Sequence, residues 1–277
     1  MNFEEMNIDK EILEAIKDMK FEKPTEIQEK SLPPALLGKD IIAQSMTGSG
    51  KTAVFAVPII QFVERGKGMQ ALVLAPTREL ANQISEQFRK MSRHKKVRIC
   101  EVFGGVSIEP QIHDLRTAEI VIGTPGRMLD HMRRGTINFR GVKMLVLDEA
   151  DRMLDMGFID DIKDIVSALP KKRQTMLFSA TIPDEIMYIA RRYMSDPVRI
   201  MAQRHVEKHK LKQVYYDVKS EYKVSLLLHL IEKENPSLAI VFCSTRTTTD
   251  IVANHLEQNG VEAKAIHGGL TQSRRTT

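Results

Sequence analysis

The sequence has few cysteines and no long apolar run, and both shortages narrow the classes of protein it can belong to. Only two cysteines occur in 277 residues, Cys100 and Cys243. Their wide separation excludes a disulfide framework and a zinc site built on closely spaced cysteines. Each lies in an apolar, β-like run, so we expect two buried, reduced thiols. No apolar stretch approaches the roughly 20 residues of a transmembrane helix.

The N-terminus excludes one further class of protein, and the charge balance leaves the nature of the partner open. Residues 1–13 (MNFEEMNIDKEIL) lack the basic flank and apolar stretch of a secretory signal. We therefore expect a soluble, cytoplasmic protein without a membrane partner. The 41 basic and 36 acidic side chains leave a formal net charge of +5. This mild excess permits a polyanionic partner but does not by itself argue for one.

The chain contains no low-complexity tract or short repeat, and instead alternates between two patterns. Near-continuous apolar runs such as ALVLAPT (71–77), EIVIGTP (119–125) and KMLVLDEAD (143–151) are separated by segments of helical period. Strands that are apolar throughout are typical of a sheet buried on both faces. The sequence therefore predicts an α/β protein with a parallel sheet flanked by helices.

A polar, weakly patterned stretch over residues 202–212 (AQRHVEKHKLK) interrupts this alternation. We interpret it as a linker between a complete domain, residues 1–201, and the beginning of a second, residues 213–277. In the second domain we expect helices over about residues 221–234 and 247–258. Three strands should accompany them, namely QVYYDV (213–218), LAIVFCST (238–245) and VEAKAIH (261–267).

The segment SMTGSGKT (45–52) lies between an apolar run and a helical segment, which is the context of a phosphate-binding loop. Small residues let backbone N–H groups turn toward phosphate oxygens at a helix N-terminus. Lys51 should then reach the β- and γ-phosphates, and Thr52 should offer its hydroxyl to Mg²⁺. The match to G-x-x-x-x-G-K-[ST] fails only at Ser45. A tight turn that caps a helix is the alternative.

Two acidic residues lie at the carboxyl end of the buried strand at 145–147 and favour nucleotide hydrolysis. Open α/β sheets hold ligands at the carboxyl ends of their strands. Asp148 there can hold Mg²⁺, usually through water, and Glu149 can orient and deprotonate the attacking water. The alternative is an ordinary helix N-terminus with favourable acidic residues.

The acidic pair belongs to a set of motifs that together resemble the DEAD-box family of ATP-dependent RNA helicases. Lys20, where the family usually has glycine, and Ser45 are small departures. The resemblance runs from Phe3 to Arg275, almost the whole chain. The motifs are FEKPTEIQ (21–28), SMTGSGKT (45–52), APTRELA (75–81), GG (104–105), TPGR (124–127), DEAD (148–151), SAT (179–181), VFCST (241–245) and IHGGLTQSRR (266–275).

The resemblance implies a RecA-like sheet flanked by helices, followed by an incomplete second RecA-like lobe. It also implies ATP, Mg²⁺ and RNA as ligands. The implied ATP-binding residues are Phe21, Thr25, Gln28, Ser45, Thr47, Gly48, Ser49, Gly50, Lys51 and Thr52. Thr52 and Asp148 would face Mg²⁺, and the implied catalytic residues are Lys51, Asp148 and Glu149.

Two further groups of residues follow from the resemblance. The implied RNA-binding residues are Arg78, Gly105, Thr124 and Arg127, and the residues that would couple nucleotide state to lobe geometry are Asp151, Ser179 and Thr181. Ordinary structural roles are the alternatives: core packing for Phe3 and Phe21, a turn for Gly105, and helix capping for the Ser and Thr residues.

Two functions remain open. The first is an ATP-dependent RNA helicase that binds RNA as a single strand, or as a duplex with a single-stranded tail, and couples ATP hydrolysis to local unwinding. The second is a truncated, non-catalytic nucleotide- and RNA-binding module, because the family's arginine-bearing segment of the second lobe is not found before Thr277. A DNA-acting helicase or another ATPase fits the phosphate loop but not FEKPTEIQ combined with DEAD and SAT. Protein partners cannot be deduced.

Overall fold

The computed structural model describes residues 2–46, 48–201 and 212–270 of the chain. The chain divides into two compact units, residues 1–205 and residues 206–277. Within the described ranges, no helix is both long enough and apolar enough to cross a bilayer.

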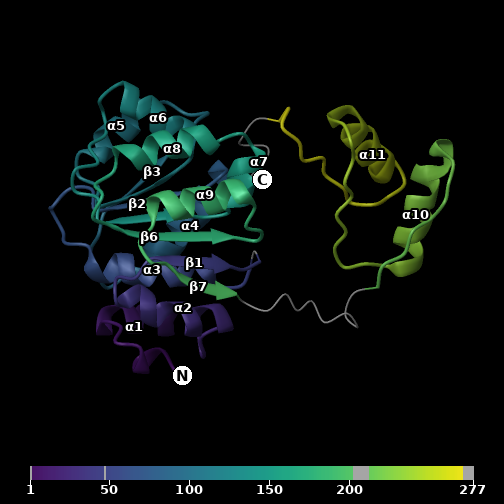
Figure 1. Ribbon diagram of the computed structural model, residues 1–277. Coiled ribbons are helices and arrows are strands. Elements are labelled where there is room, and N and C mark those ends of the chain that lie inside the picture. Colours follow the sequence, from purple (N-terminus) through teal and green to yellow (C-terminus); the bar gives the residue numbers. More distant parts are fainter. Residues whose placement is uncertain (1, 47, 202–211, 271–277) are drawn as a thin grey trace. The chain divides into compact units, whose positions relative to one another are not determined.

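The first unit is built on one seven-stranded sheet (Figure 1). Every neighbouring pair of strands is parallel, and the order across the sheet is β3-β4-β2-β5-β6-β1-β7. The strands are β1 (Ile41–Gln44), β2 (Ala71–Leu74), β3 (Ile99–Val102), β4 (Ile120–Gly123), β5 (Met144–Leu147), β6 (Gln174–Ser179) and β7 (Val198–Met201). The predicted parallel sheet is confirmed.

Helices cover both faces of this sheet (Figure 1). A short 3-10 turn, η1 (Phe3–Glu5), precedes them. The helices are α1 (Lys10–Asp18), α2 (Glu26–Leu36), α3 (Lys51–Phe62), α4 (Arg78–Met91), α5 (Glu109–Leu115), α6 (Pro125–Arg133), α7 (Ala150–Asp155), α8 (Ile159–Ala168) and α9 (Asp184–Tyr193).

The pleat of the strands separates two apolar cores. On β6, Phe178 joins the core with residues of α1 to α4, while Leu177 joins the core with residues of α6 to α9. The Phe55 ring of α3 lies 5.2 Å from the Phe178 ring and 5.9 Å from the Phe88 ring, between centroids. Because alternate side chains of each strand point to opposite faces, a strand between two helical layers must be apolar at every position. This explains the near-continuous apolar runs of the sequence.

The strand order divides the carboxyl edge of the sheet into two halves. Neighbouring strands β1, β6 and β5 end at residues 44, 179 and 147, and are followed by the phosphate-loop, SAT and DEAD segments. Strands β2, β4 and β3 fill the other half, and are followed by the PTREL, TPGR and GG segments. All these segments therefore meet at one edge, although Ser45 and Ser179 are 134 positions apart in the chain.

The second unit, in its described part, contains η3 (Ser220–Tyr222), α10 (Lys223–Glu234) and α11 (Arg246–Gln258). Both predicted helices are confirmed within about two residues. The three predicted strands are not: the described residues of this unit include no strand. A strand needs a hydrogen-bonded neighbour, and here two apolar side chains of the expected central strand are largely in solvent, with Leu238 81% and Phe242 93% exposed.

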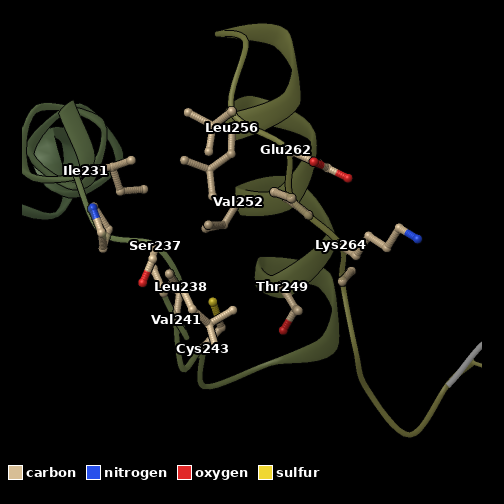
Figure 2. Close-up of a pocket in the computed structure, with 16 residues that line it drawn as sticks. Ile231, Ser237, Leu238, Val241, Cys243, Thr249, Val252, Leu256, Glu262 and Lys264 are labelled. Atoms are coloured by element: carbon tan, nitrogen blue, oxygen red, sulfur yellow. The ribbon is translucent and has the colours of Figure 1, made fainter. Parts of the chain in front are cut away.

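The apolar interior of the second unit is loosely filled. Figure 2 shows Ile231 from α10 facing Val252 and Leu256 from α11 across a cavity of about 550 Å³. Leu256 is the one buried apolar residue among the described positions of this unit. Cys243 lines the same cavity and is only half-buried, which corrects its expected burial, whereas Cys100 in β3 is buried as predicted. Burial raises the pKa of the Cys100 thiol to about 12.

Candidate nucleotide site and nucleic-acid interface

The loop between β1 and α3 has the backbone shape that its glycines allow. Gly48 and Gly50 have φ angles of +81° and +89°, a region that favours glycine. A Cβ atom on Gly50 would lie 2.6 Å from Nε2 of Gln28, so the Gln28 amide would have to move to make room for it. Lys51 and Thr52 follow directly in the first turn of α3. The chain thus places backbone N–H groups and the positive end of a helix at one point.

Thr25 and Gln28 hold this loop from outside. They form a capping box at the start of α2, in which the Thr25 N–H donates to Oε1 of Gln28 over 2.9 Å. The Thr25 hydroxyl donates to the Ser49 carbonyl, and Nε2 of Gln28 to the Gly50 carbonyl, both over 2.9 Å. The FEKPTEIQ segment is therefore part of the loop's support, whatever else it binds.

An acidic pair faces the loop lysine. Nζ of Lys51 lies 2.9 Å from Oδ1 of Asp148 and 3.7 Å from Oε1 of Glu149. The Asp148 side chain is fully buried, and burial raises the pKa of its carboxyl although Lys51 acts in the opposite direction. Glu149 has a φ of +50°, rare for a residue with a side chain, at the turn into α7.

A cavity of about 410 Å³ lies beside these groups. It is lined by Phe21, Gln28, the loop glycines, Lys51, Thr52 and the acidic pair, together with residues of α4. Three buried oxygens of this region have no hydrogen-bond partner among the described residues: the hydroxyls of Ser45 and Ser49, and Oδ2 of Asp148. Unpaired buried oxygens next to a buried cation suit a ligand that carries both phosphate oxygens and a bound metal ion.

The acidic segment is tied to the loop after β6. The Asp151 N–H donates to Oγ of Ser179 over 3.0 Å. Oδ2 of Asp151 accepts from the Thr181 N–H over 2.8 Å and from the Thr181 hydroxyl over 2.9 Å. Burial raises the pKa of the Asp151 carboxyl, but these hydrogen bonds outweigh it and hold the pKa below its usual value. The three predicted coupling residues thus form one connected group.

This group predicts a pH-dependent contribution to stability. A carboxyl whose pKa is lowered by folding stabilises the protein above its unfolded pKa of about 4, and that contribution is lost as the pH falls through the folded value. We expect Asp151→Asn to lower the free energy of unfolding at pH 7 by about 1 kcal/mol, because the carboxylate is partly exposed. The difference from wild type should shrink below about pH 4.

Denaturant unfolding from pH 3 to 7 measures this difference, and Asp155→Asn on the same helix is the control, which should change little. A constant difference across that range would contradict the proposed hydrogen bonds to a charged Asp151.

The other half of the sheet edge carries a cationic cluster. The Arg78 guanidinium, at the start of α4, lies 4.7 Å above the Phe103 ring, and its Nε is buried without a hydrogen-bond partner in the described part of the chain. Gly105 has a φ of +79°, and a Cβ there would lie 3.6 Å from Nη1 of Arg78. That distance is an ordinary contact, so it is the positive φ that favours glycine at this position.

Arg127 approaches the same loop from α6. Its Nη2 donates to the Val106 carbonyl over 3.1 Å, while Nη1 is buried and has no partner among the described residues. Thr124, half-buried, stands at the N-cap of the same helix without a side-chain capping bond. Two arginines, an exposed glycine turn and a helix N-terminus are groups that contact phosphate oxygens.

Comparison with known proteins decides between the families that share such a sheet. Residues 25–189 match the family model described as DEAD/DEAH box helicase, and residues 222–277 match the model described as helicase conserved C-terminal domain. The chain belongs to the DEAD/DEAH box helicase family.

Three relatives of this family illustrate the match. The chain is 44% identical to a probable ATP-dependent RNA helicase of Methanocaldococcus jannaschii, 44% to the DEAD-box ATP-dependent RNA helicase CshA of Geobacillus kaustophilus, and 45% to CshA of Listeria monocytogenes. Each match covers 99% of this chain. The chain spans 74% of the first relative's length, 59% of the second's and 53% of the third's.

A solved structure extends the likeness to the fold. The crystal structure of a DEAD box protein from Methanococcus jannaschii matches with a TM-score of 0.72 and 44% identity, over 99% of this chain and 75% of that one. The predicted RecA-like fold is therefore confirmed.

The structure gathers most of the residues that the family resemblance singled out. Phe21, Gln28, Gly48, Gly50, Lys51, Thr52, Asp148 and Glu149 line one cavity. Ser45 and Ser49 lie in the adjoining loop, and Thr25 contacts that loop. Thr47 falls outside the described residues. Phe3 is buried in the core, and Phe21 packs against that core while reaching the cavity. The roles of these residues remain predictions.

Some residues of the site were not predicted. Leu80, Ile84, Gln87 and Met91 of α4 line the cavity opposite the phosphate loop. Leu80, Ile84 and Met91 are spaced along one face of a helix, so the apolar period of this segment could have predicted that they lie together. Gln44 is different: its Nε2 donates to the Ala180 carbonyl over 2.9 Å and joins the end of β1 to the SAT loop. A single glutamine at a strand end carries no pattern that reveals this contact.

Proposed function

We propose that the chain is an RNA-dependent ATPase of the helicase type, which binds ATP and RNA and couples hydrolysis to local unwinding of duplexes. The observation that carries the proposal is the placement of the Asp148 and Glu149 carboxylates within 4 Å of Nζ of Lys51, at the sheet edge that also carries Arg78 and Arg127. One rigid sheet thus holds a site for hydrolysis beside a site for a polyanion.

The chain's own residues would divide the work as follows. Lys51 leaves its contact with Asp148 and binds phosphate oxygens, because these charged oxygens compete with the carboxylate for its N–H donors. The backbone of residues 48–51 binds the phosphates, and Phe21 stacks on the base. Glu149 accepts a proton from the attacking water and orients it toward the terminal phosphate.

Thr52 and the unpartnered Oδ2 of Asp148 are suited to Mg²⁺, whose preferred ligands are oxygens. Mg²⁺ would supply charge neutralisation on the phosphate oxygens. A cytoplasmic location is proposed with this function, since ATP and RNA are both available there.

RNA binding through backbone contacts has a measurable salt dependence. Arg127→Ala should weaken binding of single-stranded RNA for all sequences alike. It should also lower the slope of log affinity against log salt by about 0.7, the contribution of one phosphate contact on a single strand. Fluorescence anisotropy at several salt concentrations measures both. Arg140→Ala, an exposed arginine outside this edge, is the control. An unchanged slope in Arg127→Ala would place the RNA elsewhere.

Phosphate release tests the proposed function as a whole. The 277-residue chain is incubated with ATP, Mg²⁺ and single-stranded RNA, or with DNA of the same sequence, and strand displacement is measured on an RNA duplex with a single-stranded tail. We expect stimulation by RNA and not by DNA, because 2′-hydroxyls are part of the contact. Equal stimulation by DNA would favour a DNA-acting ATPase. Binding of both ligands without RNA-stimulated release would favour a binding module.

A further inference from the structure

A buried histidine and a buried glutamine connect two elements that the proposed chemistry does not use. His131 on α6 is fully buried, and Gln111 on α5 is 6% exposed. Nε2 of His131 lies 3.2 Å from Oε1 of Gln111, and Nδ1 lies 2.8 Å from the Thr136 hydroxyl. Nε2 of Gln111 in turn donates to the carbonyls of Phe103 and Ser107, over 3.1 and 3.4 Å.

These contacts fix the orientation of every group in the chain of hydrogen bonds. Both backbone carbonyls are acceptors, so the amide nitrogen of Gln111 must face them and its oxygen must face His131. That oxygen only accepts, so the proton of the neutral imidazole lies on Nε2. Nδ1 is then an acceptor, so the single proton of the Thr136 hydroxyl goes to Nδ1 at 2.8 Å rather than to the His131 carbonyl at 3.2 Å. Burial and nearby Arg127 lower the pKa of His131, which favours this neutral form.

The loop that Gln111 holds is the one that carries the GG motif. Gln111 binds the carbonyls at its two ends, residues 103 and 107, and the exposed Gly104 and Gly105 lie between them. Phe103 supports the Arg78 guanidinium, and the Val106 carbonyl accepts from Arg127. A shift of this loop would therefore move the glycine turn and both arginines relative to one another.

We propose that Gln111 is a positioning residue for the RNA-backbone site, and that His131 fixes the orientation of its amide. The proposal rests on the proposed function in that it takes this face of the protein to bind RNA. Gln111 and His131 lie beneath the surface, and the structure gives them no route to contact the RNA themselves. Their effect is on the geometry of Gly105, Arg78 and Arg127.

Gln70 provides a matched control. It is 1% exposed, and its Nε2 likewise donates to two carbonyls of a loop, those of Glu64 at 2.7 Å and Gly68 at 3.2 Å. That loop precedes β2 and lies away from the carboxyl edge. Gln70→Met and Gln111→Met therefore remove comparable hydrogen bonds from comparably buried sites, and only one of the two supports the RNA face.

The experiment measures the RNA concentration for half-maximal stimulation of ATP hydrolysis, the ATP affinity and the denaturant midpoint for each variant. Gln111→Met should raise the half-maximal RNA concentration about tenfold and leave ATP affinity unchanged, since it frees two carbonyls at the ends of the loop. Both variants should lower the denaturant midpoint by similar amounts, but Gln70→Met should leave the half-maximal RNA concentration unchanged. Hydrogen exchange of the amides of residues 104–107 should accelerate in Gln111→Met alone.

Variants of His131 test the second half of the proposal without altering Gln111. His131→Gln keeps a donor toward Oε1 of Gln111 and should stay close to wild type, whereas His131→Leu should raise the half-maximal RNA concentration. The double variant Gln111→Met with His131→Leu should be no worse than Gln111→Met, because the two residues act as one unit.

Two results would overturn the proposal and leave the proposed function standing: RNA stimulation unchanged in Gln111→Met, or weakened equally in Gln70→Met. Absence of RNA binding by the unaltered chain would instead overturn the proposed function.

Discussion

Replacing Glu149 by glutamine should reduce RNA-stimulated ATP hydrolysis by about 10²- to 10⁴-fold while leaving ATP affinity near that of wild type. Glutamine has the shape of glutamate but does not accept a proton at neutral pH. The change therefore removes the proposed general base and keeps the packing of the turn into α7. Lys51 keeps its 2.9 Å contact with Asp148, so the phosphate loop should remain intact.

The geometry at Glu149 explains why the effect should be specific to this carboxylate. Glu149 lines the cavity beside Lys51, and Nη1 of Arg152 lies 3.3 Å from its second oxygen. Asp148, one residue earlier, is fully buried and its Oδ1 also accepts from the Glu149 N–H. We therefore propose that Glu149 contacts a water beyond the phosphate loop, whereas Asp148 faces the loop itself through Lys51.

Single-turnover phosphate release and ATP titration, run side by side, separate the two effects. Glu86→Gln is the matched control, because Glu86 lines the same cavity from α4 but lies on a helix rather than at a strand end. It should hydrolyse ATP at nearly the wild-type rate. A Glu149→Gln protein that retains a tenth or more of the activity would show that another group accepts the proton.

The parts of the fold that follow from local patterns were predictable. The inner strands β2, β4 and β5 are buried at every position and carry almost only apolar residues, whereas the edge strands β3 and β7 are partly exposed, and the period changes at every helix. The edge at which the site lies also follows, because parallel strands share one carboxyl edge. The order of the strands along that edge did not: it depends on crossovers, and the sequence carries no direct record of which strand lies beside which.

The candidate site was predictable where one short segment carries several of its groups. Gly50, Lys51 and Thr52 are contiguous, and so are Asp148 and Glu149. The motifs alone therefore identified them as candidate site residues. Gln111 and His131 are separated by 20 positions and reach the GG loop through buried hydrogen bonds. Isolated polar residues on amphipathic helices have no distinguishing pattern. Only the three-dimensional contacts show that they act together.

In the second unit, the sequence predicted strands that the described residues do not form. The run LAIVFCST has the composition of a buried strand, and the sequence predicted one. Strand formation requires a partner, and the described residues of the unit provide none, so Leu238 and Phe242 remain in solvent. Composition reports what a segment could bury, whereas pairing decides whether it forms a strand.

Lys51→Ala should have two separable effects, since Lys51 is both the proposed phosphate ligand and the partner of a buried carboxylate. Loss of a charge-assisted contact to phosphate should weaken ATP binding about ten- to a hundredfold. Isothermal titration with ATP and Mg²⁺ measures this first effect. Equal affinity in wild type and variant would contradict the assignment of the phosphate loop.

The second effect is on stability and depends on pH. Lys51 is 7% exposed at its side chain and Asp148 is fully buried, so removing the lysine leaves an uncompensated buried charge. Breaking such a pair costs about 3–5 kcal/mol. Burial already raises the pKa of Asp148, and without Lys51 it should rise further. A group with a raised folded pKa stabilises most below its unfolded pKa, so the variant should lose stability relative to wild type once the pH rises above the folded pKa of Asp148 in wild type, which already lies above its usual value.

A second substitution separates the two effects. Asp148→Asn in the Lys51→Ala background removes the buried charge, and should restore much of the stability at pH 7 and flatten its pH dependence. It should not restore ATP affinity, because the phosphate ligand is still missing. If the double variant bound ATP as tightly as wild type, the weak binding of Lys51→Ala would come from the unpaired carboxylate, and Lys51 would serve Asp148 rather than the nucleotide.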